Sequence, residues 1–228
     1  MARWREEVLE MPQRFTWGFL SLLLVGVAMA AAPSIATFPD PRIDEPERHA
    51  SKRETAVLAG GCFWGVEAVY DHVKGVVSTV SGYSGGDRKT AHTSMVESGG
   101  TGHAESVKLT YDPSQISYGQ ILKIFFSVVH NPTERNRQGP DVGPQYRSVI
   151  FFADDKQKSV AEAYIHQLDQ ANVYGARIVT EVVPLRGFYA AEEVHQHYSE
   201  RNPQAPYVVA NDLPKLTALK RDFPGLYK

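Results

Sequence analysis

The chain has 228 residues, of which 43% are hydrophobic and 22% are charged, a composition typical of one globular domain with an additional segment. Its formal net charge of −2 gives no electrostatic reason to expect nucleic acid as a partner. The single cysteine, Cys62, excludes an intramolecular disulfide framework and any metal site built from several cysteines.

The N-terminal segment carries the only signal of cellular location. Residues 17–32 are apolar and uncharged, and the run is shorter than the roughly 20 residues that span a bilayer. It ends in an A-x-A pattern at residues 28–30, of the kind that signal peptidases recognise. Residues 1–32 are therefore predicted to be a signal peptide or an N-terminal anchor, and the protein is predicted to be exported, either periplasmic or anchored facing the periplasm.

The next segment differs sharply in composition. Residues 33–54 are rich in proline and charge, so they cannot bury enough apolar surface to become ordered, and a disordered linker is predicted. The true start is open between Met1 and Met11, because a start at Met11 gives a more usual leader. A membrane is a partner only if the leader stays uncleaved.

The folded domain is predicted over residues 55–228. Hydrophobic periodicity, glycine stops and helix-capping residues define its elements. In chain order they are a strand at 55–61, a helix at 62–75, strands at 76–83 and 103–113, a helix at 117–130 capped by Ser117, a strand at 147–153, a helix at 154–172, a strand at 177–185, a short helix at 190–200 and a polar surface tail after 205.

This order, β-α-β-β-α-β followed by a helix and a strand, predicts an α+β fold: a ferredoxin-like split βαβ two-layer sandwich with an added helix and strand. Two long glycine- and proline-rich loops, at 84–102 and 131–146, interrupt the pattern. Long loops in a compact domain are uncommon unless they are functional, so both are predicted to surround the site.

Cys62 lies where the first strand gives way to the first helix, directly after Gly60 and Gly61. A helix start presents free N–H groups and a positive dipole end, which favour the reactive thiolate, and the glycines give access to the sulfur. The alternative is a buried filler residue, the commonest role of a free cysteine. The adjacent aromatic pair Phe63–Trp64 favours a functional role.

Glu105 is the second residue that stands out. Alternation in the strand at 103–113 places it on the same face as Val107, Leu109 and Tyr111, which is the apolar face. An acid on that face is unusual. It indicates a carboxyl group whose pKa is raised by burial, as a general acid at neutral pH requires.

Five motifs occur in order: GCFWGVEAV, GYSGG, TGHAESVKLTYDP, NRQGPDVGPQYRS and HQHY. Together they resemble the A-type peptide methionine sulfoxide reductases, and the resemblance covers residues 55–228. It implies reduction of methionine-S-sulfoxide, free and in proteins, to methionine, without a bound cofactor or metal.

The resemblance also implies roles for individual residues. They are Cys62 as the nucleophile that attacks the sulfoxide sulfur, Glu105 as the acid that protonates its oxygen, Phe63 and Trp64 as the pocket for the substrate methyl group, Tyr146 as a hydroxyl donor to the oxygen, Asp141 as a carboxylate that organises the site and its water, and His195 near the site with its role open.

Two departures from the family pattern matter. Thr93 stands where the family usually has a tyrosine that donates to the sulfoxide oxygen, so either Tyr83 or a water substitutes, or binding is weaker. The chain also lacks the further cysteines that resolve the sulfenic acid in many relatives. The expected reductant is therefore an external thiol: thioredoxin, glutaredoxin or glutathione. The expected partners are this reductant and oxidised proteins and peptides, and a monomer is expected.

Two other function classes remain open from the residues. A cysteine hydrolase would pair Cys62 with His103 or His195. A non-enzymatic module would use the Phe63–Trp64 pocket to capture peptides, and it would keep working after Cys62→Ser. His195 and His197 are two residues apart, so on a helix they point apart and do not share a metal.

Overall fold

The computed structural model describes residues 38–44 and 52–228. The predicted signal peptide or anchor at 1–32, and the choice between Met1 and Met11, lie outside the described residues. Within the described residues, none of the helices combines the length and the apolar character needed to cross a bilayer.

The centre of the domain is a six-stranded sheet in the order β7-β6-β1-β3-β2-β8. All neighbouring strands are antiparallel except β6 and β7, which are parallel. The inner four strands, β6-β1-β3-β2, have the order of the predicted ferredoxin-like sandwich. The strands are β1 (Glu54–Gly60), β2 (Val76–Ser84), β3 (Ala104–Tyr111), β6 (Ser148–Phe152), β7 (Glu181–Pro184) and β8 (Phe188–Ala190), and β4 (Arg137–Gln138) and β5 (Asp141–Val142) form a separate hairpin.

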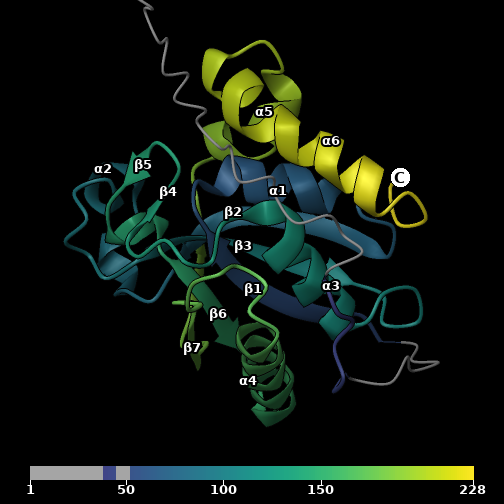
Figure 1. The fold of residues 1–228 in the computed structure, drawn as a ribbon. Helices are drawn as coiled ribbons and strands as arrows, with labels where there is room; N and C mark the ends of the chain where they lie inside the picture. Colours follow the sequence, from purple (N-terminus) through teal and green to yellow (C-terminus); the bar gives the residue numbers. More distant parts are fainter. Residues whose placement is uncertain (1–37, 45–51) are drawn as a thin grey trace, which may run out of the picture. The chain divides into compact units, whose positions relative to one another are not determined.

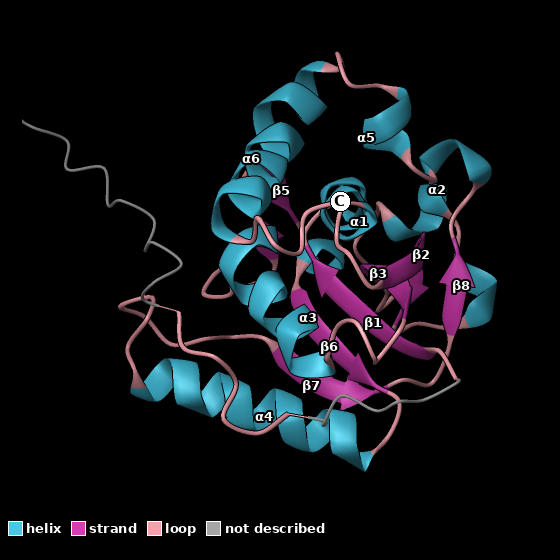
Figure 2. Ribbon diagram, turned by 90° about the vertical axis from the view of Figure 1, so that its right-hand side faces the viewer, coloured by secondary structure: helices cyan, strands magenta, loops and turns pink. Residues whose placement is uncertain are grey.

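Helices complete the α+β fold (Figures 1 and 2). Helix α1 packs on β1, β2 and β3, and the C-terminal helices α5 and α6 lie against its other side. Helix α4 packs against α3, against β6 and against the added strand β7. The helices are α1 (Phe63–Asp71), α2 (Thr93–Val96), α3 (Tyr118–Ile124), α4 (Asp155–Gln170), α5 (Tyr198–Arg201) and α6 (Leu213–Asp222), with π turns at Phe125–Val129 and Val208–Asp212 and 3₁₀ turns at Arg88–Thr90, Pro144–Tyr146 and Glu193–His195.

The C-terminal part differs from its prediction. The expected polar tail after residue 205 is a π turn followed by α6, because Val208 and Leu219 are fully buried against the domain. The expected helix at 190–200 is broken into a 3₁₀ turn and α5 by His197, whose φ of 48 lies in the left-handed region. Strand β8 was not predicted; Phe188–Ala190 is too short to show alternation.

The prediction of a disordered linker over 33–54 is wrong for residues 38–44. Phe38 is only 5% exposed and contacts the edge of the Tyr174 ring, with ring centroids 5.6 Å apart. Asp44 accepts hydrogen bonds from the Ser117 hydroxyl (2.5 Å) and the Gly119 N–H (2.7 Å), at the start of α3. One apolar anchor and one helix cap thus order a stretch whose composition alone indicates disorder.

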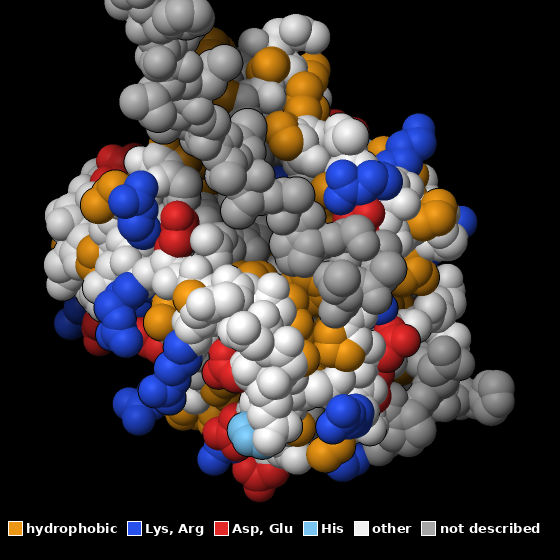
Figure 3. Space-filling model, in the orientation of Figure 1, with side chains coloured by type: hydrophobic (Ala, Val, Ile, Leu, Met, Phe, Trp, Pro, Cys, Tyr) orange, Lys and Arg blue, Asp and Glu red, His pale blue; other side chains and the backbone are white. Residues whose placement is uncertain are grey.

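On the face of the described residues drawn in Figure 3, basic and acidic side chains are interspersed. They do not gather into one stripe of a single sign on that face.

Replacement of Asp44 tests this anchoring. Asp44→Ala should lower the free energy of unfolding by about 1–2 kcal/mol, because it removes two hydrogen bonds at a helix N-terminus. Urea unfolding of the full chain followed by circular dichroism measures the change. Asp40→Ala is the matched control: its side chain is 86% exposed and, among the described residues, pairs with Lys123 at the surface, so less than about 0.5 kcal/mol is expected. Equal effects of the two substitutions would contradict the anchoring.

Candidate active site

The antiparallel sheet brings the predicted site residues to one edge. The ends of β1 and β2 lie beside the beginnings of β3 and β6, because neighbouring strands run in opposite directions. Tyr83 pairs directly with Glu105 across β2 and β3, and Gly60 pairs with Ser148 across β1 and β6. Cys62, two residues beyond Gly60, and Tyr146, two residues before Ser148, therefore meet at the same edge.

Cys62 is the N-cap residue of α1 and is 8% exposed. The chain turns into the helix through Gly61, whose φ is +94; a Cβ there would lie 2.7 Å from the Gln138 side chain. Burial and the nearby Glu105 carboxylate raise the pKa of the Cys62 thiol well above its usual value, although a hydrogen bond from the Trp64 N–H acts in the opposite direction. The helix start therefore lowers the thiol pKa in the expected direction, but burial and Glu105 outweigh it, so the resting thiol is not acidified.

Glu105 is one reason why the helix start does not give Cys62 a low pKa. Its carboxylate accepts the Phe63 N–H at 3.0 Å, so it shares the free N–H groups of α1 with Cys62. Only 7% of Glu105 is exposed. Burial raises its pKa to about 8, against hydrogen bonds from Phe63 and the Cys62 thiol that lower it. The expected position on the apolar face is confirmed: Val107, Leu109 and Tyr111 are fully buried.

Tyr146 ends the 3₁₀ turn before β6 and is half-buried. Burial, together with the nearby Glu105 and Cys62, raises its pKa, so the phenol stays protonated. Its hydroxyl has no hydrogen-bond partner within residues 38–44 and 52–228, which leaves its proton available to a bound molecule.

Asp141, in the β4–β5 hairpin, accepts a 2.5 Å hydrogen bond from the Tyr207 hydroxyl. Cys62, Asp141 and Tyr207 line one cavity of about 220 Å³. Tyr207 was not among the predicted site residues. Its partner is 66 positions away in the chain, and the segment around it has no local pattern that indicates a site.

Phe63 and Trp64 differ in their surroundings. Phe63 is 2% exposed and packs in the core, whereas Trp64 is half-buried. The Trp64 indole stacks on Tyr198 at 3.8 Å between ring centroids and contacts the Tyr207 ring edge-on at 5.8 Å. Its Nε1–H donates to Nδ1 of His195 at 3.3 Å.

Thr93 begins α2 and bonds to residues from two other segments. Its Oγ1 lies 2.7 Å from the Tyr83 hydroxyl, 2.6 Å from Oε2 of Glu192 and 3.0 Å from Nε2 of His195. Glu192 was not predicted as a site residue, since glutamates in exposed turns are common. The structure therefore places Thr93, Tyr83 and His195, the three residues whose roles were open, in one hydrogen-bonded group.

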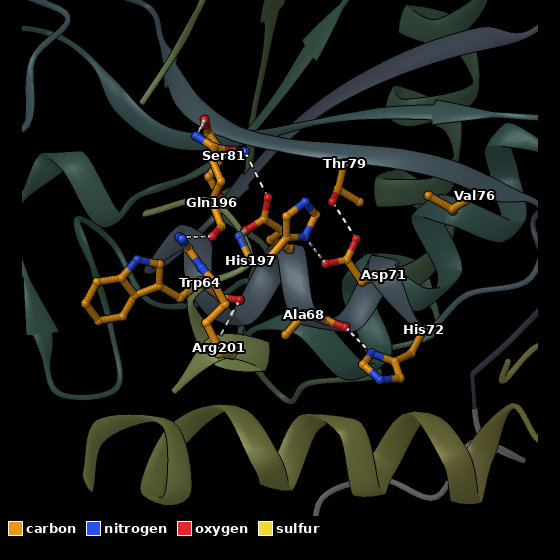
Figure 4. A network of polar contacts seen from close by, with 12 residues as sticks. Trp64, Ala68, Asp71, His72, Val76, Thr79, Ser81, Gln196, His197 and Arg201 are labelled. Carbon is orange, nitrogen blue, oxygen red and sulfur yellow. Dashed lines mark hydrogen bonds and ion pairs between the residues drawn. The ribbon is translucent and has the colours of Figure 1, made fainter. Parts of the chain in front are cut away.

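The turn that carries His195 is fixed to the sheet by its neighbours (Figure 4). Gln196 exchanges two 2.9 Å hydrogen bonds with the backbone of Ser81. The His197 N–H donates to the buried Glu67 carboxylate at 2.7 Å, and its ring pairs with Asp71 at 2.8 Å. His195 and His197 thus face different partners, although the helix on which that expectation was based is broken at His197.

The hydrolase alternative requires a histidine that bonds to Cys62, and within residues 38–44 and 52–228 no histidine does. His103 accepts the Gly86 N–H through Nδ1 and reaches the Asp87 carbonyl through Nε2. His195 bonds to Trp64 and Thr93. His130, which lines the cavity beside Cys62, uses both nitrogens on Phe125 and Ser148, and burial lowers its pKa to about 3.

The shared helix start predicts how Cys62 responds when Glu105 loses its charge. Glu105→Gln should shift the alkylation of Cys62 by iodoacetamide to lower pH, because a negative neighbour that raises the thiol pKa is removed. Mass spectrometry measures the modification directly, since the chain has no other cysteine. Asp141→Asn is the control: Asp141 raises the thiol pKa less, so a smaller shift is expected. A shift to higher pH in Glu105→Gln would contradict this coupling.

Comparisons with known proteins identify the family. Residues 54–225 match the family model described as peptide methionine sulfoxide reductase. Peptide methionine sulfoxide reductase MsrA 2 of Mesorhizobium japonicum is 55% identical over 79% of this chain and 93% of its own length. MsrA 2 of Synechocystis is 48% identical over 90% of this chain and 99% of its own.

Solved structures agree with these relatives. Reduced Mxr1 of Saccharomyces cerevisiae superposes with a TM-score of 0.61 at 32% identity, over 72% of this chain and 92% of that one. Methionine sulfoxide reductase A of Corynebacterium diphtheriae superposes with a TM-score of 0.59 at 31% identity, over 74% of this chain and 85% of that one. The chain therefore belongs to the A-type peptide methionine sulfoxide reductases: it is a peptide-methionine (S)-S-oxide reductase, which returns oxidised methionine in proteins to methionine.

Proposed function

We propose that Cys62 and Glu105 carry out the reduction as a pair that shares one proton. The observation that supports this most directly is the burial of both groups at the N-terminus of α1, where Glu105 accepts the Phe63 N–H next to Cys62. Because each negative charge disfavours the other in this buried site, the two groups do not both lose their protons, and one proton stays with the pair.

In the first step the Cys62 proton passes to the ionised form of Glu105, which leaves a thiolate beside a neutral carboxylic acid. The thiolate attacks the sulfoxide sulfur, and Glu105 protonates the oxygen, which is a poor leaving group until then. A Cys62–sulfur bond forms as the sulfur–oxygen bond weakens. Transfer of the hydroxyl to Cys62 releases methionine and leaves a sulfenic acid. The cysteine sulfur is oxidised by two electrons, and the substrate sulfur is reduced by two.

Tyr146 is the hydroxyl donor to the sulfoxide oxygen in this proposal. Its proton is uncommitted, whereas the Tyr83 hydroxyl is bonded to Thr93. A fixed donor at a developing negative charge lowers the barrier in the manner of an oxyanion hole. Phe63 and Trp64 hold the substrate methyl group, and Asp141, fixed by Tyr207, organises polar groups in the cavity beside Cys62.

The sulfenic acid is then removed by an external thiol. With Cys62 as the chain's one cysteine, the first thiol must come from outside: it forms a mixed disulfide and releases water, and a second thiol restores Cys62. We propose a thioredoxin-like protein for this step, with glutaredoxin or glutathione as alternatives. The apolar run at 17–32 supports export, so the reductant would act in the periplasm, and we expect the enzyme to be a monomer.

Turnover of Glu105→Gln tests the acid. The variant keeps an acceptor for the Phe63 N–H but has no proton to donate, so kcat for methionine-S-sulfoxide with dithiothreitol should fall about 100-fold or more. Glu97→Gln removes a nearby charge from an exposed position and should stay within about twofold of the wild type. An unchanged kcat in Glu105→Gln would rule out this role for Glu105.

A single turnover without reductant tests the intermediate. Methionine-S-sulfoxide should add one oxygen to Cys62, detected by intact mass and by trapping with dimedone, while the R epimer should add none. Cys62→Ser should show neither the adduct nor turnover. A disulfide-linked dimer as the main product, or turnover by Cys62→Ser, would contradict the proposal.

A further inference from the structure

We infer that Thr93 is a positioning residue: its hydroxyl selects the tautomer of His195 and thereby holds the Trp64 indole that forms a wall of the substrate pocket. The inference rests on the proposed function, which places the substrate methyl group against Trp64. It assigns Thr93 a different task from the tyrosine that its relatives carry there.

The hydrogen bonds fix the protonation of His195. The indole Nε1–H of Trp64 can only donate, so Nδ1 of His195, 3.3 Å away, must present its lone pair. A neutral imidazole with a lone pair on Nδ1 carries its proton on Nε2. That proton points to Oγ1 of Thr93 at 3.0 Å, so Thr93 must accept it.

The bonding capacity of Thr93 allows only one arrangement. A hydroxyl has one proton and two lone pairs, and Thr93 has three partners. The ionised Glu192 carboxylate can only accept, and it takes the proton at 2.6 Å. The two lone pairs then accept from Tyr83 and His195. The Thr93 N–H also donates to the other carboxylate oxygen of Glu192 at 3.1 Å. Both oxygens of Glu192 are therefore bound to Thr93.

The backbone around His195 does not depend on Thr93. Gln196 is bound to Ser81, and His197 is bound to Glu67. Loss of the Thr93 hydroxyl should therefore remove the hydrogen bond that fixes the His195 ring and its tautomer, while the backbone of the turn stays in place. The indole then loses the acceptor for its N–H and keeps its ring contacts with Tyr198 and Tyr207.

Thr93→Val and Thr93→Ser form a matched pair, because valine has the shape of threonine without the hydroxyl and serine retains the hydroxyl. In the full chain, Thr93→Val should raise KM for methionine-S-sulfoxide about three- to tenfold, the effect of losing one hydrogen bond, with kcat within twofold. Thr93→Ser should restore KM to within twofold of the wild type.

Nuclear magnetic resonance provides a readout that does not depend on activity. The indole N–H signal of Trp64, assigned with Trp64→Phe, should move in Thr93→Val and stay in place in Thr93→Ser. In a Trp64→Phe background, Thr93→Val should have no further effect on KM, because the two residues act through the same contact.

Three results would overturn the inference: an unmoved Trp64 signal in Thr93→Val, an additional KM increase in the Trp64→Phe background, or a fall in kcat at constant KM. The last would mean that Thr93 acts on the sulfoxide oxygen itself. If the wild type fails to reduce the sulfoxide while the Trp64 signal still moves in Thr93→Val, the proposed function is at fault and the positioning by Thr93 stands.

Discussion

Two acidic groups share one helix N-terminus, and the chemistry of the site depends on this. The Phe63 N–H bonds to Glu105, and the Trp64 N–H bonds to the sulfur of Cys62. Because the pair is buried, two negative charges side by side would carry a large free-energy cost, and the resting thiol keeps its proton. In the proposed mechanism a sulfoxide changes this balance by accepting the proton from Glu105. Reactivity would then appear only with the substrate present, and the resting thiol would be protected from indiscriminate oxidation.

Segments far apart in sequence enclose this pair. The β4–β5 hairpin supplies Asp141, the C-terminal segment supplies Tyr207, and the turn before α5 supplies His195. Close contact between the C-terminal segment and α1 requires Gly65, where a Cβ would lie 2.4 Å from Oδ1 of Asp212. Through Tyr207 and Lys215 the same segment also lines the cavity beside Cys62.

Periodicity and motif reading predicted the inner sheet, α1, α3 and α4, because each has enough residues to show its own pattern. Cys62 and Glu105 stood out for physical reasons: one follows two glycines at a helix start, and the other is an acid on an apolar strand face. The ordering of residues 38–44 could not be predicted in this way, since it depends on Phe38 and Asp44 meeting partners from distant helices.

The sequence by itself determined which groups can react: one thiol, one acid on the buried face of a strand, and no second cysteine to resolve the product. Only the tertiary structure decided how those groups are tuned. The raised pKa of Cys62 arises from burial and from a carboxylate 43 positions away in the chain, which outweigh the local helix start. The task of Thr93 likewise depends on partners from β2 and from the turn before α5, and no local pattern reports a hydrogen bond across 102 residues.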